Sequence, residues 1–156
     1  GYELHTDDLP VGDKDSKGLV PAADYTNQQK IGDVDVYFGC RHAHHDWLFK
    51  DEMKRYVSEG IITKLHTAFS RDDSNKSYVQ DVMRQQGAAQ RLVDITLKEN
   101  GVVYICGDGN SMARDVQNAI AEILGKKADG STDIDFGRTR IEQLKKEGRF
   151  LLDIWS

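Results

Sequence analysis

The stretch "VVYICGDGNSMARDVQNAIAEIL" (residues 102–124) places an apolar run, a glycine-containing turn and an amphipathic pattern in direct succession. The run from Val102 to Gly107 contains no charged residue, which is typical of a strand buried on both faces of a parallel sheet. After the turn, Met112, Val116 and Ile120 recur on one stripe at helical spacing. Strand, tight turn and helix in this order predict an α/β fold.

The same alternation continues towards the N-terminus. The β-rich run "VDVYFGC" (34–40) precedes a helical pattern at 46–60, for which Asp46 is the expected N-cap. The run "ITKLHTAFS" (62–70) predicts the next strand.

A second helix is expected to open at Ser77, where Ser77 and Gln80 fit an S-x-x-Q capping box. We expect this helix to reach about Glu99, with a break near Gly87. A short helix near 141–146 and a terminal strand complete the pattern. The order of elements predicts a three-layer, Rossmann-like parallel sheet with helices on both faces.

Composition and charge limit the classes of function. The 156 residues carry a formal net charge of -5 and are 38% hydrophobic, as in a soluble globular domain, and the charge argues against nucleic-acid binding. No apolar run is long enough to span a membrane, and residue 1 does not begin a signal peptide. The two cysteines favour a reducing compartment over a disulfide framework.

The first 33 residues differ from the rest. They hold both prolines and lack a sustained periodicity, so we expect a flexible lead-in at 1–33 and one domain at 34–156. Ligands of open parallel sheets bind at the carboxyl ends of the strands. Three polar loops occupy that edge: "GCRHAHHD" (39–46), "SRDDSNKSY" (70–78) and "CGDGNSM" (106–112).

The loop at 70–78 combines donors suited to a phosphorylated ribose. Ser70 offers a hydroxyl, Arg71 a planar guanidinium, Lys76 a point charge, and Tyr78 a phenol whose ring could stack on adenine. Such a group could hold the 2′-phosphate of NADP. An ordinary polar loop is the alternative, and Asp72 and Asp73 would oppose an anion if they pointed inwards.

The other two loops leave alternatives open. "CGDGNSM" approaches the G-x-G-x-x-G dinucleotide fingerprint, but Met112 stands where the third glycine belongs, so a plain tight turn explains it equally well. His42, His44 and His45 could suggest a metal, but nothing completes the ligand set, and we predict no metal site. Cys106 is either a small core residue or part of the ligand crevice.

The chain ends in "GRFLLDIWS" (148–156). As a strand, this segment points two sets of side chains in opposite directions. The set expected in the core is Phe150, Leu152 and Ile154, and the opposite set is Leu151, Asp153 and Trp155. The second face therefore carries a carboxylate and an indole side by side.

Several blocks together resemble the C-terminal NADPH-binding module of the diflavin reductases, relatives of plant ferredoxin–NADP reductase. They are "YFGCRH", "AFSRD", "KSYVQD", "YICGDGNSMARDVQNAI" and "DIWS", in order from about residue 34 to residue 156. The resemblance implies an NADPH-dependent flavoprotein oxidoreductase that passes electrons from NADPH to FAD to FMN. The family's "GTGIAPF"-type segment is absent, so the chain is expected to be a fragment whose sheet lacks its first strand.

The resemblance also implies roles for particular residues. The residues matching cofactor contacts are Arg41, Ser70, Arg71, Lys76, Tyr78, Gln80, Gly107, Asp108 and Asp115. Cys106 and Asp153 match members of the hydride-transfer site, and Trp155 matches the aromatic residue that covers the flavin.

The implied partners are the FAD- and FMN-binding domains of the same polypeptide. Among family members, the likeness favours one whose electron acceptor is cobalamin-dependent methionine synthase, with a cytoplasmic location. A microsomal haemoprotein reductase on the cytoplasmic face of the endoplasmic reticulum is the alternative. A noncatalytic nucleotide-binding domain is the alternative of another class, and the isolated fragment is expected not to turn over NADPH.

Overall fold

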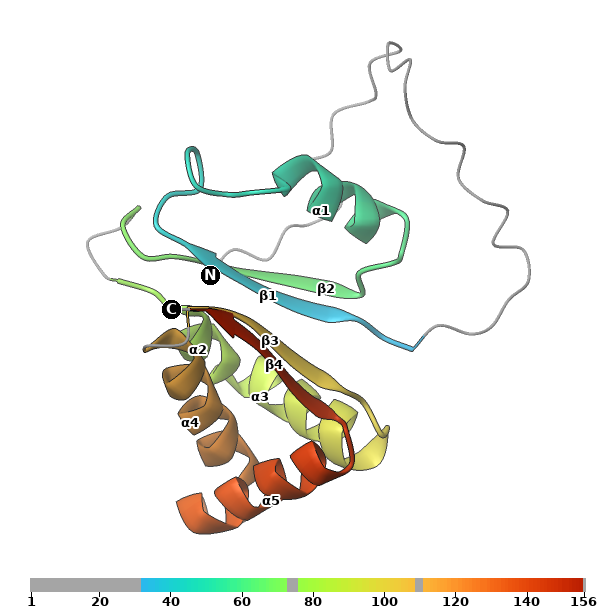
Figure 1. Ribbon diagram of the computed structural model, residues 1–156, viewed down its shortest axis with the longest axis vertical. Coiled ribbons are helices and arrows are strands. Elements are labelled where there is room, and N and C mark those ends of the chain that lie inside the picture. The colour runs from blue at the N-terminus through green and yellow to red at the C-terminus, as the bar shows by residue number, and fades with distance from the viewer. Residues whose placement is uncertain (1–31, 73–75, 109–110, 156) are drawn as a thin grey trace.

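The computed structural model describes residues 32–72, 76–108 and 111–155 (Figure 1). The fold is α/β, as predicted, and strands alternate with helices along the chain. The elements are β1 (Asp35–Cys40), α1 (Lys50–Ser58), β2 (Lys64–Phe69), α2 (Val79–Met83), α3 (Gln86–Val93), the π-helix η2 (Asp94–Lys98), β3 (Val103–Asp108), α4 (Met112–Leu124), α5 (Ile134–Lys146) and β4 (Phe150–Trp155).

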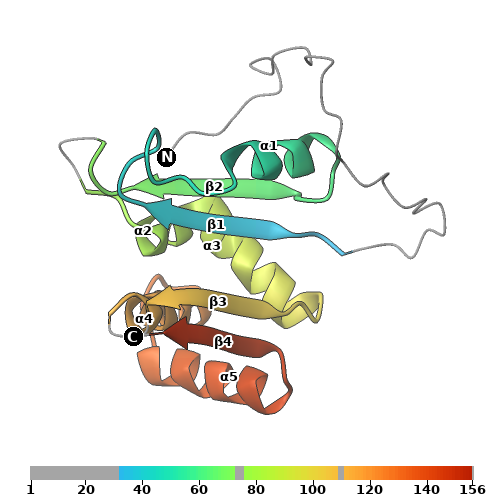
Figure 2. The ribbon, with the colours of Figure 1, turned by 45° about the horizontal axis from the view of Figure 1, so that its top comes forward.

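The strands form two parallel pairs rather than one continuous ladder. β1 pairs with β2 from Asp35↔Lys64 to Cys40↔Phe69, and β3 pairs with β4 from Val103↔Phe150 to Asp108↔Trp155. Figure 2 shows the order β2, β1, β3, β4, with β1 and β3 facing each other across the interruption. This is the sheet expected of the fold class when its first strand is missing.

Helices cover the two strand pairs unequally. α1 lies on one side of the β1–β2 pair, and α2 to α5 lie on the other side of the strands (Figures 1 and 2). The face of the β3–β4 pair opposite α4 has no helix on it in the described part of the chain, and Tyr104 on that face is 61% exposed. None of the described helices is long and apolar enough to cross a membrane.

The hydrophobic core lies between β3, β4 and the helices α4 and α5. Ile120 and Ala119 of α4 are fully buried, and Ile120 belongs to one core cluster with Ile105, Leu144 and Phe150. Burial of the apolar stripe that runs along α4 accounts for the predicted periodicity.

A glycine permits the close approach of the two core helices. A Cβ atom added at Gly137 in α5 would lie 1.8 Å from the carbonyl oxygen of Ala121 in α4. No side chain fits there, so the helix crossing depends on glycine at this position.

Two predicted helix starts were wrong. α1 begins at Lys50 rather than after Asp46, because the Asp46 carboxylate accepts a hydrogen bond from the His42 backbone N–H (3.1 Å) and closes a turn instead. α2 begins at Val79, and its N-cap is Tyr78, whose backbone N–H donates to the Asp81 carboxylate (2.9 Å). The Ser77–Gln80 capping box is therefore displaced by one residue.

The second helix breaks near Gly87, as predicted. The break lies at Arg84 and Gln85, because Gln85 adopts an extended conformation and caps α3. In β4, Phe150 is buried as predicted, but Leu152 and Ile154 are exposed. Ile154 lies opposite Gly107, which has no side chain to cover it.

Candidate functional site

A cavity of about 550 Å³ opens at the carboxyl ends of β1, β2 and β3. Its size falls in the range typical of small-molecule and cofactor sites. The lining residues are Tyr37, Gly39, Cys40, Arg41, Ala68, Ser70, Ser77, Tyr78, Val79, Gln80, Cys106, Ser111, Met112 and Asp115. They come from four segments of the chain, residues 37–41, 68–70, 77–80 and 106–115. The cavity thus joins the first and second polar loops to the turn that follows β3.

Six of the residues predicted to bind or act on the cofactor line this cavity. They are Arg41, Ser70, Tyr78, Gln80, Cys106 and Asp115. These six side chains supply a guanidinium, two hydroxyl groups, an amide, a thiol and a carboxylate. Arg41 forms no ion pair with any residue in the described part of the chain, so its charge is available to an anionic ligand.

The β1–β2 ladder continues into the first two loops. The Ser70 N–H donates to the Cys40 carbonyl (3.0 Å), and the Arg71 N–H donates to the Arg41 carbonyl (2.9 Å). Arg41 and Ser70 line the cavity, whereas the exposed Arg71 does not. Arg71 lies in the turn that follows β2, where the chain leaves the sheet.

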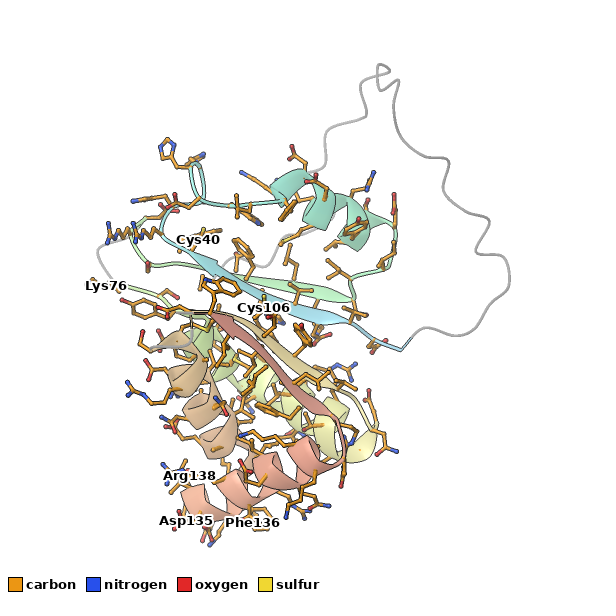
Figure 3. All side chains as sticks on the ribbon, in the orientation of Figure 1. Cys40, Lys76, Cys106, Asp135, Phe136 and Arg138 are labelled. Atoms are coloured by element: carbon orange, nitrogen blue, oxygen red, sulfur yellow. The ribbon has the colours of Figure 1, made fainter. Side chains whose placement is uncertain are left out.

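Lys76 also lies outside the cavity lining and is exposed. In Figure 3 it lies at the end of the molecule to which the strands β1 and β2 point, as Cys40 does. Asp73 belongs to the residues between Asp72 and Lys76 that the structure does not describe. A role for Arg71 and Lys76 in phosphate binding stays a prediction.

The Asp72 carboxylate does not point at the cavity. One oxygen lies 3.0 Å from His42 Nδ1, and the other accepts a hydrogen bond from the Ala43 backbone N–H (2.9 Å). The Ala43 N–H, together with His42, lowers the pKa of Asp72 below its ordinary value. Asp72 therefore joins the first two loops at the sheet edge.

The turn after β3 has an unusual backbone at Gly107. Its φ of 144° is rarely adopted by other residues, and a Cβ there would lie 2.3 Å from Met112 Cε. Met112 replaces the third glycine of the dinucleotide fingerprint, and its side chain folds back against Gly107. Gly107 and Asp108 themselves are absent from the cavity lining, and residues 109–110 lie outside the described part.

The uncovered face of the β3–β4 pair carries the residues expected at the hydride-transfer site. Cys106 is the register partner of Asp153, and Asp108 is the register partner of Trp155. Cys106 and Trp155 are both exposed, and 60% of Trp155 is accessible to solvent. The three predicted residues Cys106, Asp153 and Trp155 therefore share one face at the carboxyl end of this pair.

Tyr104 belongs to the same face. Its hydroxyl lies 3.4 Å from Asp153 Oδ2, which is long for a hydrogen bond between oxygens. The Asp153 carboxylate nevertheless raises the pKa of the Tyr104 phenol, because a neighbouring negative charge opposes ionisation. Tyr104 was not among the predicted site residues.

Sequence reasoning also missed several cavity residues. Tyr37 lines the cavity, stacks on the His66 ring and is shielded enough that burial raises its pKa to about 12. Its position could have been found, because Tyr37 and Gly39 alternate along β1 and so share a face at the strand end that leads to Arg41. Ser77, Ser111 and Met112 lie in the polar loops 70–78 and 106–112, but their residue types gave no reason to select them as site residues.

The histidine-rich loop does not converge on a metal site. His42 is hydrogen-bonded to Asp72, and its ring meets that of His45 edge to face with centroids 6.4 Å apart. Among the residues that the structure describes, no three histidine, cysteine or acidic side chains form a group that could hold a metal ion.

Comparison with known proteins gives consistent matches. A profile of the oxidoreductase NAD-binding domain family matches residues 20–118. Methionine synthase reductase from Rattus norvegicus is 38% identical over 133 residues, and the human protein is 39% identical over 132 residues. NADPH–cytochrome P-450 reductase from Phanerodontia chrysosporium is 38% identical over 132 residues.

These alignments cover most of this chain but a small part of each relative. They include 81% of this chain and 18% of each methionine synthase reductase, and 80% of this chain and 17% of the fungal reductase. The chain thus spans less than a fifth of the length of these relatives. With its parallel strands, its edge cavity and the family match over residues 20–118, the chain belongs to the oxidoreductase NAD-binding domain family, as an NADP-binding module of the diflavin reductase type.

Proposed function

We propose that this chain is the NADPH-binding and hydride-transfer module of a diflavin oxidoreductase. The observation that carries the proposal is the edge cavity, in which Arg41, Ser70 and Tyr78 lie with Cys106 at the same sheet edge. A guanidinium and hydroxyl groups suit a phosphorylated ribose, and an exposed tyrosine ring can stack on a base. These residues fit NADPH, which supplies a hydride when bound.

Arg71 and Lys76 are proposed to add to phosphate binding from the rim of the cavity. Both are exposed, so their long side chains are free to turn towards a ligand. Gln80, Gly107, Asp108 and Asp115 are proposed as further cofactor contacts.

Cys106 and Asp153 are proposed to orient the nicotinamide end. Their adjacent positions on β3 and β4 support this role, and a carboxylate stabilises developing positive charge most strongly where water is excluded. The exposed indole of Trp155 is proposed to cover the flavin, because a flat aromatic face suits stacking on a ring system.

FAD and FMN are proposed to be held mainly by other domains of the same polypeptide. The uncovered β3–β4 face supports a neighbour there, since Tyr104 and Trp155 expose large apolar surfaces. Electrons are then proposed to pass from NADPH to FAD and on to FMN.

The whole protein is proposed to be a methionine synthase reductase in the cytoplasm, with methionine synthase as the electron acceptor. The matches to methionine synthase reductases from rat and human support this choice. A microsomal cytochrome reductase is the second candidate, favoured by the 38% identity to the fungal protein. A purely noncatalytic nucleotide-binding domain would use the cavity without Asp153 and Trp155.

Nucleotide binding is tested by titrating the chain with 2′-phospho-ADP-ribose in a calorimeter. Arg41→Ala should weaken binding by about 10- to 100-fold, because a charge-assisted phosphate contact is lost. The matched control Arg55→Ala, in α1, removes the same charge away from the cavity and should change affinity less than about twofold. Equal affinities for the two variants, or no binding by the unaltered chain, would refute the proposed site.

Hydride transfer is tested in the full-length enzyme with Trp155→Ala. Removing the indole should relax discrimination against NADH, because the nicotinamide no longer competes with a stacked ring. The measurement is kcat/KM for NADPH and for NADH. An unchanged ratio of the two values contradicts the role of Trp155.

A further inference from the structure

A clasp of hydrogen bonds to one carboxylate joins the two loops that bring Arg41 and Ser70 to the cavity. The clasp consists of His42, Ala43 and Asp72. His42 Nδ1 lies 3.0 Å from one Asp72 oxygen, and the Ala43 N–H donates to the other at 2.9 Å. Because a carboxylate only accepts hydrogen bonds, His42 Nδ1 must carry the proton of this contact.

The clasp begins where the backbone ladder ends. The last backbone bond between the loops runs from the Arg71 N–H to the Arg41 carbonyl. At the next residue, the Asp72 side chain connects the two loops. It bonds to His42 and Ala43, the two residues that follow Arg41, and so fixes the path of the chain after Arg41.

A second carboxylate holds the same turn from inside the first loop. The His42 N–H donates to the Asp46 carboxylate (3.1 Å), and the Asp46 N–H donates to the His42 carbonyl (3.0 Å). His42 is therefore held by Asp46 through its backbone and by Asp72 through its ring. The His42–Asp72 pair is partly shielded from solvent, with 39% of the His42 side chain and 29% of the Asp72 side chain exposed.

We propose that Asp72 is a positioning residue that holds Arg41 in place for a phosphorylated nucleotide. This inference rests on the proposed function and explains why a carboxylate stands beside an anion site. A loop fixed before binding loses less conformational entropy when the ligand arrives.

Charge alone predicts the opposite effect. A negative side chain near the cavity repels an anionic ligand, so its neutralisation should strengthen binding. If Asp72 acts as a clasp, its neutralisation should weaken binding. The sign of the change therefore separates the two accounts.

The test is a titration of the 156-residue chain with 2′-phospho-ADP-ribose. Asp72→Asn should weaken binding about three- to tenfold, since one immobilised side chain accounts for that much. Asp72→Ala should weaken it further, because Asn retains one acceptor oxygen. The control Asp51→Asn, in α1, removes an equal charge and should leave the affinity unchanged. An increase or no change with Asp72→Asn overturns the proposal.

A double-mutant cycle tests whether Asp72 works through Arg41. In an Arg41→Ala background the effect of Asp72→Asn should vanish, because there is no guanidinium left to position. Additive losses would show a general structural role and overturn the proposal.

The histidine gives a rescue experiment. His42→Asn keeps an N–H donor near the position of Nδ1 and should retain most of the affinity, whereas His42→Ala should match Asp72→Asn. Equal losses for the two His42 variants contradict the clasp. If the unaltered chain does not bind the nucleotide, the proposed function fails as well; if it binds but Asp72→Asn binds equally, only the positioning role fails.

Discussion

The two strand pairs of this chain are built in different ways. In the half made of β3, α4, α5 and β4, apolar side chains form a closed core around the fully buried Ile120. In the half made of β1, α1 and β2, α1 has no buried residue, and the exposed side chains include Leu48 and Phe49. One half holds the hydrophobic core, and the other, with its loops, supplies six of the cavity-lining residues against four from the core half.

The difference shows how stability and binding are divided in an interrupted sheet. The β1–β2 half carries polar groups in its interior, such as Asp35, whose pKa is raised by burial although Arg91 opposes the shift. Arg91 forms ion pairs with Asp33 and with Glu99 (2.7 Å), so it connects the start of β1 to the end of η2. Polar connections of this kind position a loop without filling a core.

The largest expected effect is a loss of stability caused by a substitution in the core half, which consists of β3, α4, α5 and β4. Ile120→Ala should lower the free energy of unfolding by about 2–5 kcal/mol, because it leaves a cavity among fully buried neighbours. Met53→Ala, in α1, should lower it by less than about 1 kcal/mol, because that helix is only partly covered. Urea denaturation measures both values. Similar losses for the two variants would mean that the halves are equally packed.

A smaller effect is expected at the helix crossing. Gly137→Ala should destabilise the protein by about 1–3 kcal/mol, because α4 and α5 must move apart to admit a methyl group. Gly87→Ala, in α3, is the matched control. An added Cβ there meets nothing within 4 Å, so this change should stabilise the helix by up to about 1 kcal/mol. Thermal unfolding of the two variants should move in opposite directions.

The sequence predicted the core half well because periodicity reports burial directly. Val116 and Ile120 recur on one stripe, and the structure buries both. The start of α1 could not be predicted, because Asp46 is a good cap by residue type and its use in a turn depends on His42. The exposure of Ile154 depends on its register partner, Gly107, which no local pattern encodes.

The candidate site was predictable in its loops but not in its side-chain directions. Arg41, Ser70 and Tyr78 could be named from residue type and strand ends, and they line one cavity. The direction of Arg71 depends on the turn after β2, whose backbone bonds from Ser70 and Arg71 to the first loop no local pattern encodes. Asp72 would oppose an anion if it pointed inwards, but its carboxylate bonds to His42 and Ala43 of the first loop instead.

The smallest expected effect is a loss of stability at acidic pH, which should arise in the β1–β2 half and not in the core half. The pKa of Asp72 is lowered in the folded state by the Ala43 N–H and by His42, so the unfolded chain binds a proton more readily at this site. The stabilisation from the clasp is therefore fully present above the ordinary aspartate pKa of 3.8 and is lost as the pH falls through the lowered value. Carboxyl-detected NMR of Asp72 should give a midpoint below the ordinary value, and His42→Ala should move it upwards.

The same titration should leave the packing around Ile120 unaffected, because the residues buried with Ile120 in the core cluster carry no titratable group. Amide signals of residues 41–46 should shift with the Asp72 carboxyl, whereas those of Val116 to Ala119 in α4 should not follow it. A common midpoint for both sets of signals would contradict a local clasp. It would instead indicate that acid loosens the two halves together, and Asp72 would then report global unfolding rather than the geometry of one loop.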